Sequence, residues 1–175
     1  MEIRKAAVTD IDAVENIYEK IHDAEEKGLT TIGWIRGVYP TRKTAEDALK
    51  RQDLFVMEND GQVVAAAIIN QISVKEYADA PWEHKVDASD IMVLHALVVD
   101  PDEKKKGFGR AFVSFYEDYA LHHNCRILHM DTQQKNTAAR NLYHKLGYTE
   151  VGVVNSTFNG IPGVKLVCLE KCLKN

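Results

Sequence analysis

The chain has 175 residues, of which 45% are hydrophobic and 27% are charged, and its formal net charge is -4. This length predicts one domain, residues 1–175, and the composition excludes a disordered or fibrous chain. The acidic balance argues against a nucleic-acid or membrane-surface binder, because such proteins need a surplus of Lys and Arg against phosphates.

No targeting or metal-binding pattern is visible. Residues 1–5 lack the apolar core of a signal peptide, and the apolar run 63–69 is too short to span a bilayer, so we expect a cytoplasmic protein. The cysteines Cys125, Cys168 and Cys172 contain no CxxC pair, which favours reduced thiols. No HExxH or comparable cluster occurs, and we predict no metal.

The first half of the chain predicts a strand at 3–8, a helix over 11–21, an irregular loop over 28–40 and a short helix at 41–51. Two β-branched runs at 54–58 and 62–70 flank Asn59-Asp60-Gly61, which is typical of a β-hairpin. A polar loop with one helical turn is expected over 71–89.

The second half begins with a near-continuous apolar run, 91–99, which predicts a central strand buried on both faces and interrupted only by His95. Apolar spacing predicts a helix from Gly109 to Asn124, then a strand at 126–131. A second helix is expected between the N-cap Asn136 and Gly147. Strands at 148–154 and 165–170, joined by a turn-rich segment at 155–163, close the chain.

The segment after the central strand is rich in lysine and glycine and leads into a helix. Glycines let backbone N–H groups approach oxygens, the helix N-terminus carries a partial positive charge, and lysines add attraction, so residues 104–110 favour a pyrophosphate. The segment is neither a Walker A loop nor a complete dinucleotide fingerprint. On these residues alone, a tight turn with solvated lysines is an equal alternative.

One strand later, the segment from Asn136 to Tyr148 changes this balance, because the two segments together resemble the GNAT N-acetyltransferase family. The family pattern Q/R-x-x-G-x-G/A falls on residues 104–109, with Lys104 in the first position, and N-x-x-A-x-x-x-Y-x-x-x-G-F/Y falls on 136–148 without a gap. Strict matches cover residues 97–148, and the order of elements agrees over 2–170. Residues 34–41 resemble a subgroup of small members.

The resemblance implies an α/β fold with a mixed, mainly antiparallel sheet, splayed between the strands at Ile91 and Arg126 and covered by helices on both faces. It also implies acetyl-CoA as co-substrate, with its pantetheine arm along the central strand. The residues that this assigns to the cofactor are Leu97, Val98, Val99, Lys104, Lys105, Lys106, Gly107, Phe108, Gly109, Arg110, Asn136 and Tyr143.

The chemistry that the resemblance implies is direct acetyl transfer to a primary amine, without an acetyl-cysteine. Tyr143 would protonate the leaving thiolate, since a phenol of pKa ~10 is still protonated at neutral pH. Asp131, His95 or water would accept the proton of the amine. The alternatives are a Tyr143 that packs in the core, an Asp131 that caps a turn and a His95 that is a hydrogen-bonded core residue.

The acceptor, a small-molecule or peptide amine, cannot be named from the sequence. Trp34, Tyr39, Tyr77 and Trp82 are candidates to line its pocket, and the alternatives are that they close the core or form a homodimer contact. Two other functions stay open: a CoA-binding sensor or interaction module that has lost turnover, and an acyltransferase that uses a longer acyl-CoA.

Overall fold

The computed structural model describes residues 1–174, and a seven-stranded sheet forms its centre. The sheet order is β1-β2-β3-β4-β5-β7-β6, antiparallel throughout except for the parallel pair β4–β5. The elements are β1 (Glu2–Lys5), α1 (Ile11–Glu26), α2 (Arg42–Arg51), β2 (Leu54–Asn59), β3 (Gln62–Asn70), β4 (Ile91–Val99), α3 (Phe108–His122), β5 (Ile127–Gln133), α4 (Thr137–Lys145), β6 (Thr149–Phe158) and β7 (Ile161–Cys172).

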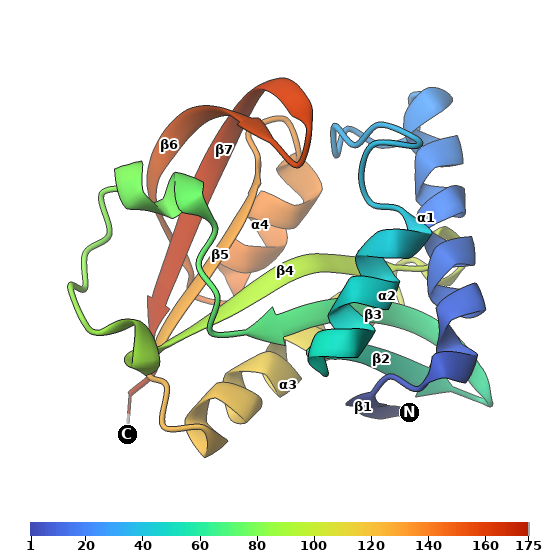
Figure 1. The fold of residues 1–175 in the computed structure, drawn as a ribbon, viewed down its shortest axis with the longest axis horizontal. Coiled ribbons are helices and arrows are strands. Elements are labelled where there is room, and N and C mark those ends of the chain that lie inside the picture. The colour runs from blue at the N-terminus through green and yellow to red at the C-terminus, as the bar shows by residue number, and fades with distance from the viewer. Residues whose placement is uncertain (175) are drawn as a thin grey trace.

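Helices cover both faces of the sheet, as expected (Figure 1). Successive side chains of a strand point to opposite faces of the sheet, so the core residues of β2 and β3 divide between two clusters, one on each face. Val56 and Ala66 pack in one cluster with α1 and α2, while Met57 and Ala65 pack in another with α3 and α4. None of the helices within residues 1–174 is long and apolar enough to cross a membrane.

The central strands separate half-way along their length, which confirms the predicted splay. β4 pairs with β5 only from Ile91 to Leu94. Beyond that point β5 stays paired with β7, and β4 stays paired with β3. A bulge lies at the point of separation, where Ala96 has a φ of +48° and the β3–β4 register shifts. Because a bulge bends and twists a strand, it turns the end of β4 away from β5.

The splay leaves the middle of β4 less buried than its sequence predicts. His95, Ala96 and Leu97 are half-buried, whereas Met92, Val93 and Leu94 are fully buried. The apolar composition of β4 therefore does not reflect burial on both faces along its whole length. Three of its residues face the gap between β4 and β5.

The C-terminal hairpin differs from its prediction. Residues 155–163 were expected to be a turn-rich connection, but β6 extends to Phe158 and β7 begins at Ile161. Only Asn159 and Gly160 connect them, with φ of +50° and +79°, and this pair of positive φ values is what Asn-Gly favours in a tight hairpin. The wrong boundary came from taking Ser156, Thr157 and Pro162-Gly163 as turn residues. These residues belong instead to β6 and β7, and the hairpin tip that they lead to lines the cavity described below.

Candidate active site

A cavity of about 190 Å³ opens where β4 and β5 separate. Its walls come from β4, the end of β5, the start of α4, the loop between α1 and α2, and the tip of the β6–β7 hairpin. The predicted site residues that line it are Trp34, Tyr39, His95, Leu97, Val98, Val99, Lys104, Asp131, Asn136 and Tyr143. The fold thus brings together most of the residues singled out from the sequence.

The turn between β4 and α3 presents backbone donors at the mouth of the cavity. Lys105 and Gly107 have φ of +67° and +84°, and α3 begins directly after Gly107. The amide of Ala111 bonds to Gly107 O at 3.0 Å, so the amides of the three residues before it lie in the first helical turn, where no intrahelical acceptor exists. A Cβ on Gly107 would meet no heavy atom within 4 Å. Open space therefore adjoins Gly107, the residue directly before these N–H groups.

Cations of the same turn are available to an anion. Lys104, Lys105 and Arg110 are exposed, and none of them forms an ion pair with another residue in 1–174. Lys106 is different, because its Nζ lies 2.6 Å from Glu103 Oε2. The side chain of Phe108 is buried in the core, so only its backbone can face the turn. Free amides, unpaired cations and open space fit a pyrophosphate.

Helix α4 places Asn136 and Tyr143 on the wall of the cavity. Asn136 Oδ1 accepts from the amide of Ala139 at 3.3 Å, which makes Asn136 the N-cap that the sequence predicts, and its Nδ2 donates to Thr132 Oγ1 at 3.0 Å. The Tyr143 hydroxyl has no hydrogen-bond partner within the described chain. Burial, with Asp131 nearby, raises the pKa of Tyr143, so this phenol is protonated at neutral pH.

Asp131 lies on β5 directly after Met130, the last residue of β5 that pairs with β4, and it lines the cavity. Its Oδ2 accepts a hydrogen bond from the Tyr77 hydroxyl at 2.7 Å. Burial raises the pKa of Asp131 to about 7, with a smaller contribution from the charge of Glu76, while the bond from Tyr77 opposes the change. A carboxyl that titrates near neutral pH can both hold a cation and accept a proton.

His95 also lines the cavity, and its ring is oriented by Asn70. The Oδ1 of Asn70 accepts from the amide of Ile72 at 2.9 Å, while its Nδ2 donates to Asp53 at 2.8 Å. That oxygen lies 3.1 Å from His95 Nε2, so Nε2 is the donor. Burial lowers the pKa of His95 to about 4, and the imidazole is therefore neutral at pH 7.

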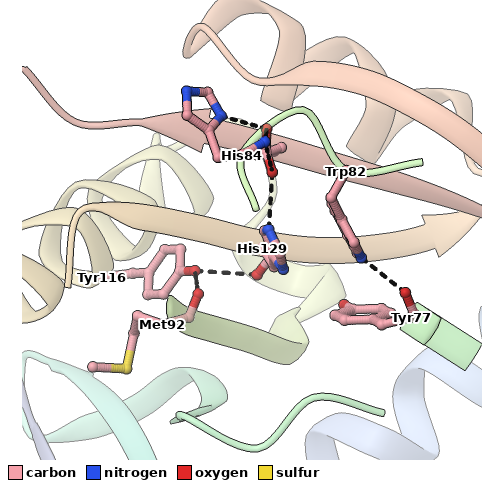
Figure 2. A network of polar contacts seen from close by, with 7 residues as sticks. Tyr77, Trp82, His84, Met92, Tyr116 and His129 are labelled. Carbon is pink, nitrogen blue, oxygen red and sulfur yellow. Dashed lines mark hydrogen bonds and ion pairs between the residues drawn. The ribbon is translucent and has the colours of Figure 1, made fainter. Parts of the chain in front are cut away.

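Tyr77 and Trp82 do not line the cavity, in contrast with the expectation for an acceptor pocket. The Trp82 ring stacks on His129 at 3.6 Å between centroids, and its Nε1 donates to Tyr77 O at 2.9 Å (Figure 2). His129 and His84 in turn hold the buried Glu170, at 3.0 and 2.7 Å. Trp82 is therefore a half-buried ring that packs against the core, and the hydroxyl of Tyr77 donates to Asp131.

One further group of side chains has metal-ligand chemistry. Glu83, His84 and Glu170 offer ligand atoms within 4.8 Å of one another. The Glu170 carboxylate already pairs with two histidines, which satisfies it without an ion. The absence of a metal stays a prediction.

Sequence reasoning missed Glu25, which shapes the wall of the cavity formed by the α1–α2 loop. Its carboxylate accepts from Thr30 Oγ1 at 2.7 Å and from the amides of Ile32 and Gly33 at 2.8 and 2.7 Å. The loop is also tied across the cleft, because Gln133 Nε2 donates to Gly33 O at 2.8 Å. A glutamate near the end of a helix gives no sequence signal for this role.

We expect Glu25→Gln to raise, about tenfold, the KM for the amine that the resemblance implies, because the amide cannot accept all three bonds and presents N–H to backbone donors. The Kd for the acetyl-CoA that the resemblance implies, and kcat, should change little, since residues 104–110 are not part of this loop. Steady-state kinetics and calorimetry measure the split. Glu46→Gln, an exposed change on α2, is the control, and an equal effect of both variants would contradict the role.

The match to a family model decides the identity. The model of the acetyltransferase (GNAT) family matches residues 14–148. The chain belongs to this family. It is therefore an acetyltransferase, with acetyl-CoA as co-substrate, and the prediction made from the two motifs is confirmed.

Individual proteins agree with this membership. The chain is 27% identical over 160 residues to YhfO of Bacillus subtilis, an uncharacterised N-acetyltransferase, with 91% of this chain and 97% of that protein covered. A GNAT acetyltransferase structure from Streptococcus agalactiae superposes with a TM-score of 0.82 at 21% identity, covering 99% of this chain and 96% of that one. YncA of Salmonella typhimurium, solved with its cofactor acetyl-CoA, gives a TM-score of 0.70 at 20% identity, covering 100% and 95%.

Proposed function

We propose that the enzyme transfers an acetyl group from acetyl-CoA to a primary amine by direct attack, with Tyr143 as general acid and Asp131 as general base. One observation carries the proposal: the cavity between β4 and β5 is lined by both a phenol without a hydrogen-bond partner among residues 1–174 and a carboxyl whose pKa is about 7. Acid and base thus meet at one site, with pKa values far apart.

The cofactor side of the cavity fits acetyl-CoA, which supplies the acetyl group as a thioester. The backbone from Ala96 to Val99 has lost β5 as a neighbour, so its free N–H and C=O groups can pair with an extended amide-containing arm, as an added strand would. An N–H of the same edge can stabilise negative charge on the thioester oxygen. Residues 104–110 would hold the pyrophosphate, and Tyr143 would protonate the departing sulfur.

Asp131 suits the role of base better than His95. A base is most effective when its pKa lies near the working pH, and the pKa of Asp131 is about 7 whereas that of His95 is about 4. The ionised carboxylate also attracts the ammonium form of the amine, which neutral His95 cannot do. His95 stays the second candidate, and water the third.

Asp131→Asn separates catalysis from stability. We expect kcat/KM at pH 8 to fall roughly 10–10²-fold, and the wild-type decline below pH 7 to disappear from the variant's profile. Because the pKa of Asp131 is raised from 3.8 to about 7, its ionisation destabilises the fold above pH 7, and this cost fades as the pH falls towards 4. The variant should therefore have the higher Tm at pH 8 and lose that advantage at pH 4.

The same comparison with His95→Gln identifies the base. If the decline of kcat/KM below pH 7 remains in Asp131→Asn but disappears in His95→Gln, His95 is the base and Asp131 is not. Ratios between variant and wild type at each pH cancel the ionisation of the acceptor itself.

An acceptor screen that follows free thiol release from acetyl-CoA tests the function as a whole. Thiol release that depends on an amine supports transfer. Tight CoA binding without release across a broad panel of amines identifies a sensor or interaction module instead, and faster release from a longer acyl-CoA identifies a different acyl donor. The small-molecule or peptide nature of the acceptor, the cytoplasmic location and a homodimer stay predictions.

A further inference from the structure

The acceptor end of the cavity has a distinctive charge pattern. Apart from the cofactor side, its lining within residues 1–174 contains one carboxyl, Asp131, the neutral imidazole of His95, and otherwise uncharged side chains. Its only cation, Lys104, belongs to the turn that faces the pyrophosphate. The acceptor end therefore offers an opposite charge to an ammonium group but none to a carboxylate.

Aromatic and aliphatic groups line the same cavity as that carboxyl. Trp34 and Tyr39 form an edge-to-face pair with ring centroids 5.7 Å apart, and both line the cavity. Ile32 adds apolar surface from the same loop, and Val74 and Phe158 add it from two other segments of the chain. Aromatic faces attract cations, and their hydrocarbon surface binds an apolar body, so this wall suits an ammonium carried on such a body.

Other cations line separate hollows. Arg51 lies in one that shares Tyr39, Val74 and His95 with the cavity, and it is already paired with Asp53 at 2.8 Å. Two lysines line another. Lys135 and Lys165 lie there, while Trp34, Gln133 and Ile161 line both that hollow and the cavity and so form the partition between them. The Gln133 side chain is fixed in this partition by its bond to Gly33 O at 2.8 Å. A carboxylate close to the amine would therefore be enclosed with Asp131 and away from these cations.

Resting on the proposed amine acetylation, we propose that the acceptor is a primary amine on an uncharged, apolar body, held through its ammonium by Asp131 and the Trp34–Tyr39 pair. Amines that carry a carboxylate on the same carbon are rejected. A second carboxylate in this cavity would lose its hydration without gaining a cation and would repel Asp131. Repulsion between two carboxylates in one cavity would therefore discriminate strongly against amines that carry a carboxylate.

Phenethylamine, phenylalaninol and phenylalanine test the proposal, because the last two differ only in a hydroxymethyl or a carboxylate beside the amine. We expect kcat/KM from thiol release to be at least about 10²-fold higher for phenylalaninol than for phenylalanine, with phenethylamine close to phenylalaninol. Calorimetric titration of the three into the enzyme–CoA complex should give the same ranking. Equal use or equal binding of phenylalanine, or no binding of any of the three, overturns the inference.

Val74→Lys places a cation on the wall, and Val74→Met is a control of similar length without the charge. The lysine variant should reduce the preference for phenylalaninol over phenylalanine about tenfold, and the methionine variant should retain it. An unchanged ratio in Val74→Lys contradicts the charge argument. If the amines bind in the expected order but no thiol is released, the proposed acetyl transfer is wrong and the ligand class is supported. If thiol is released equally with carboxylated amines, acetyl transfer is supported and the ligand class is wrong.

Discussion

Gly109→Glu should weaken CoA binding by at least about 10²-fold. Gly109 lies in the first turn of α3, and a Cβ there would point between Leu142 and Val99, at 3.4 and 3.8 Å from their side chains. The added carboxylate would lie beside the amides that we assign to the pyrophosphate and would repel it. The start of the helix tolerates the charge, because an acidic residue in the first turn favours a helix, so any loss of Tm would come from the bulk beside Leu142 and Val99. Calorimetry with CoA measures the loss.

Gly109→Gln separates charge from bulk. It has the size of the glutamate variant without its charge, so it should bind CoA more tightly than Gly109→Glu and more weakly than wild type. Gly109→Ala adds only the methyl group, for which 3.4 Å is an ordinary contact, and should retain affinity within about tenfold. Unimpaired CoA binding by the glutamate variant would place the phosphate site elsewhere.

Local patterns predicted the elements of the fold well. The helical spacing over 11–21 and the Asn59-Asp60-Gly61 turn each report a preference of neighbouring residues, and both correspond to elements of the structure. The two motifs predicted the cofactor residues for a different reason: they specify one junction, a strand that leads through glycines into a helix, and one helix face.

Contacts between distant segments were beyond the sequence. The Tyr77–Asp131 bond joins residues 54 positions apart, and nothing around either residue predicts the other. Glu25 binds its loop through backbone amides, which carry no residue identity. The bulge at Ala96 needs a left-handed conformation that alanine does not favour, so only the tertiary pairing of β4 imposes it. These features decide the shape of the acceptor end.

The same limit explains the aromatic candidates. Trp34, Tyr39, Tyr77 and Trp82 were equivalent in the sequence, since each lies in an irregular segment. The structure separates them by what surrounds each ring: the first pair faces the cavity, while Trp82 has His129 beneath its face and Tyr77 has Asp131 at its hydroxyl. The fact that an aromatic residue lies in a loop therefore did not show whether its ring lines the cavity or packs against other side chains.

Tyr143→Phe should lower kcat about 10²–10⁴-fold and leave the Kd for acetyl-CoA nearly unchanged. The Tyr143 hydroxyl has no hydrogen-bond partner within residues 1–174, so its removal leaves no buried donor or acceptor unpaired, and the Tm should stay the same. A loss of turnover at constant affinity and stability is what an acid that acts only as the thiolate leaves would produce. Calorimetry, thermal unfolding and thiol release give the three quantities.

Tyr148→Phe is the matched control, because it removes the same atom from the neighbouring ring, whose centroid lies 6.0 Å from that of Tyr143. The Tyr148 hydroxyl is buried near the Glu117 carboxylate and forms no hydrogen bond of good geometry in the described chain, so its loss should leave kcat and Tm nearly unchanged. If both variants lose activity equally, the phenylalanine at 143 acts through packing and Tyr143 is not the acid. If neither does, the departing sulfur takes its proton from water.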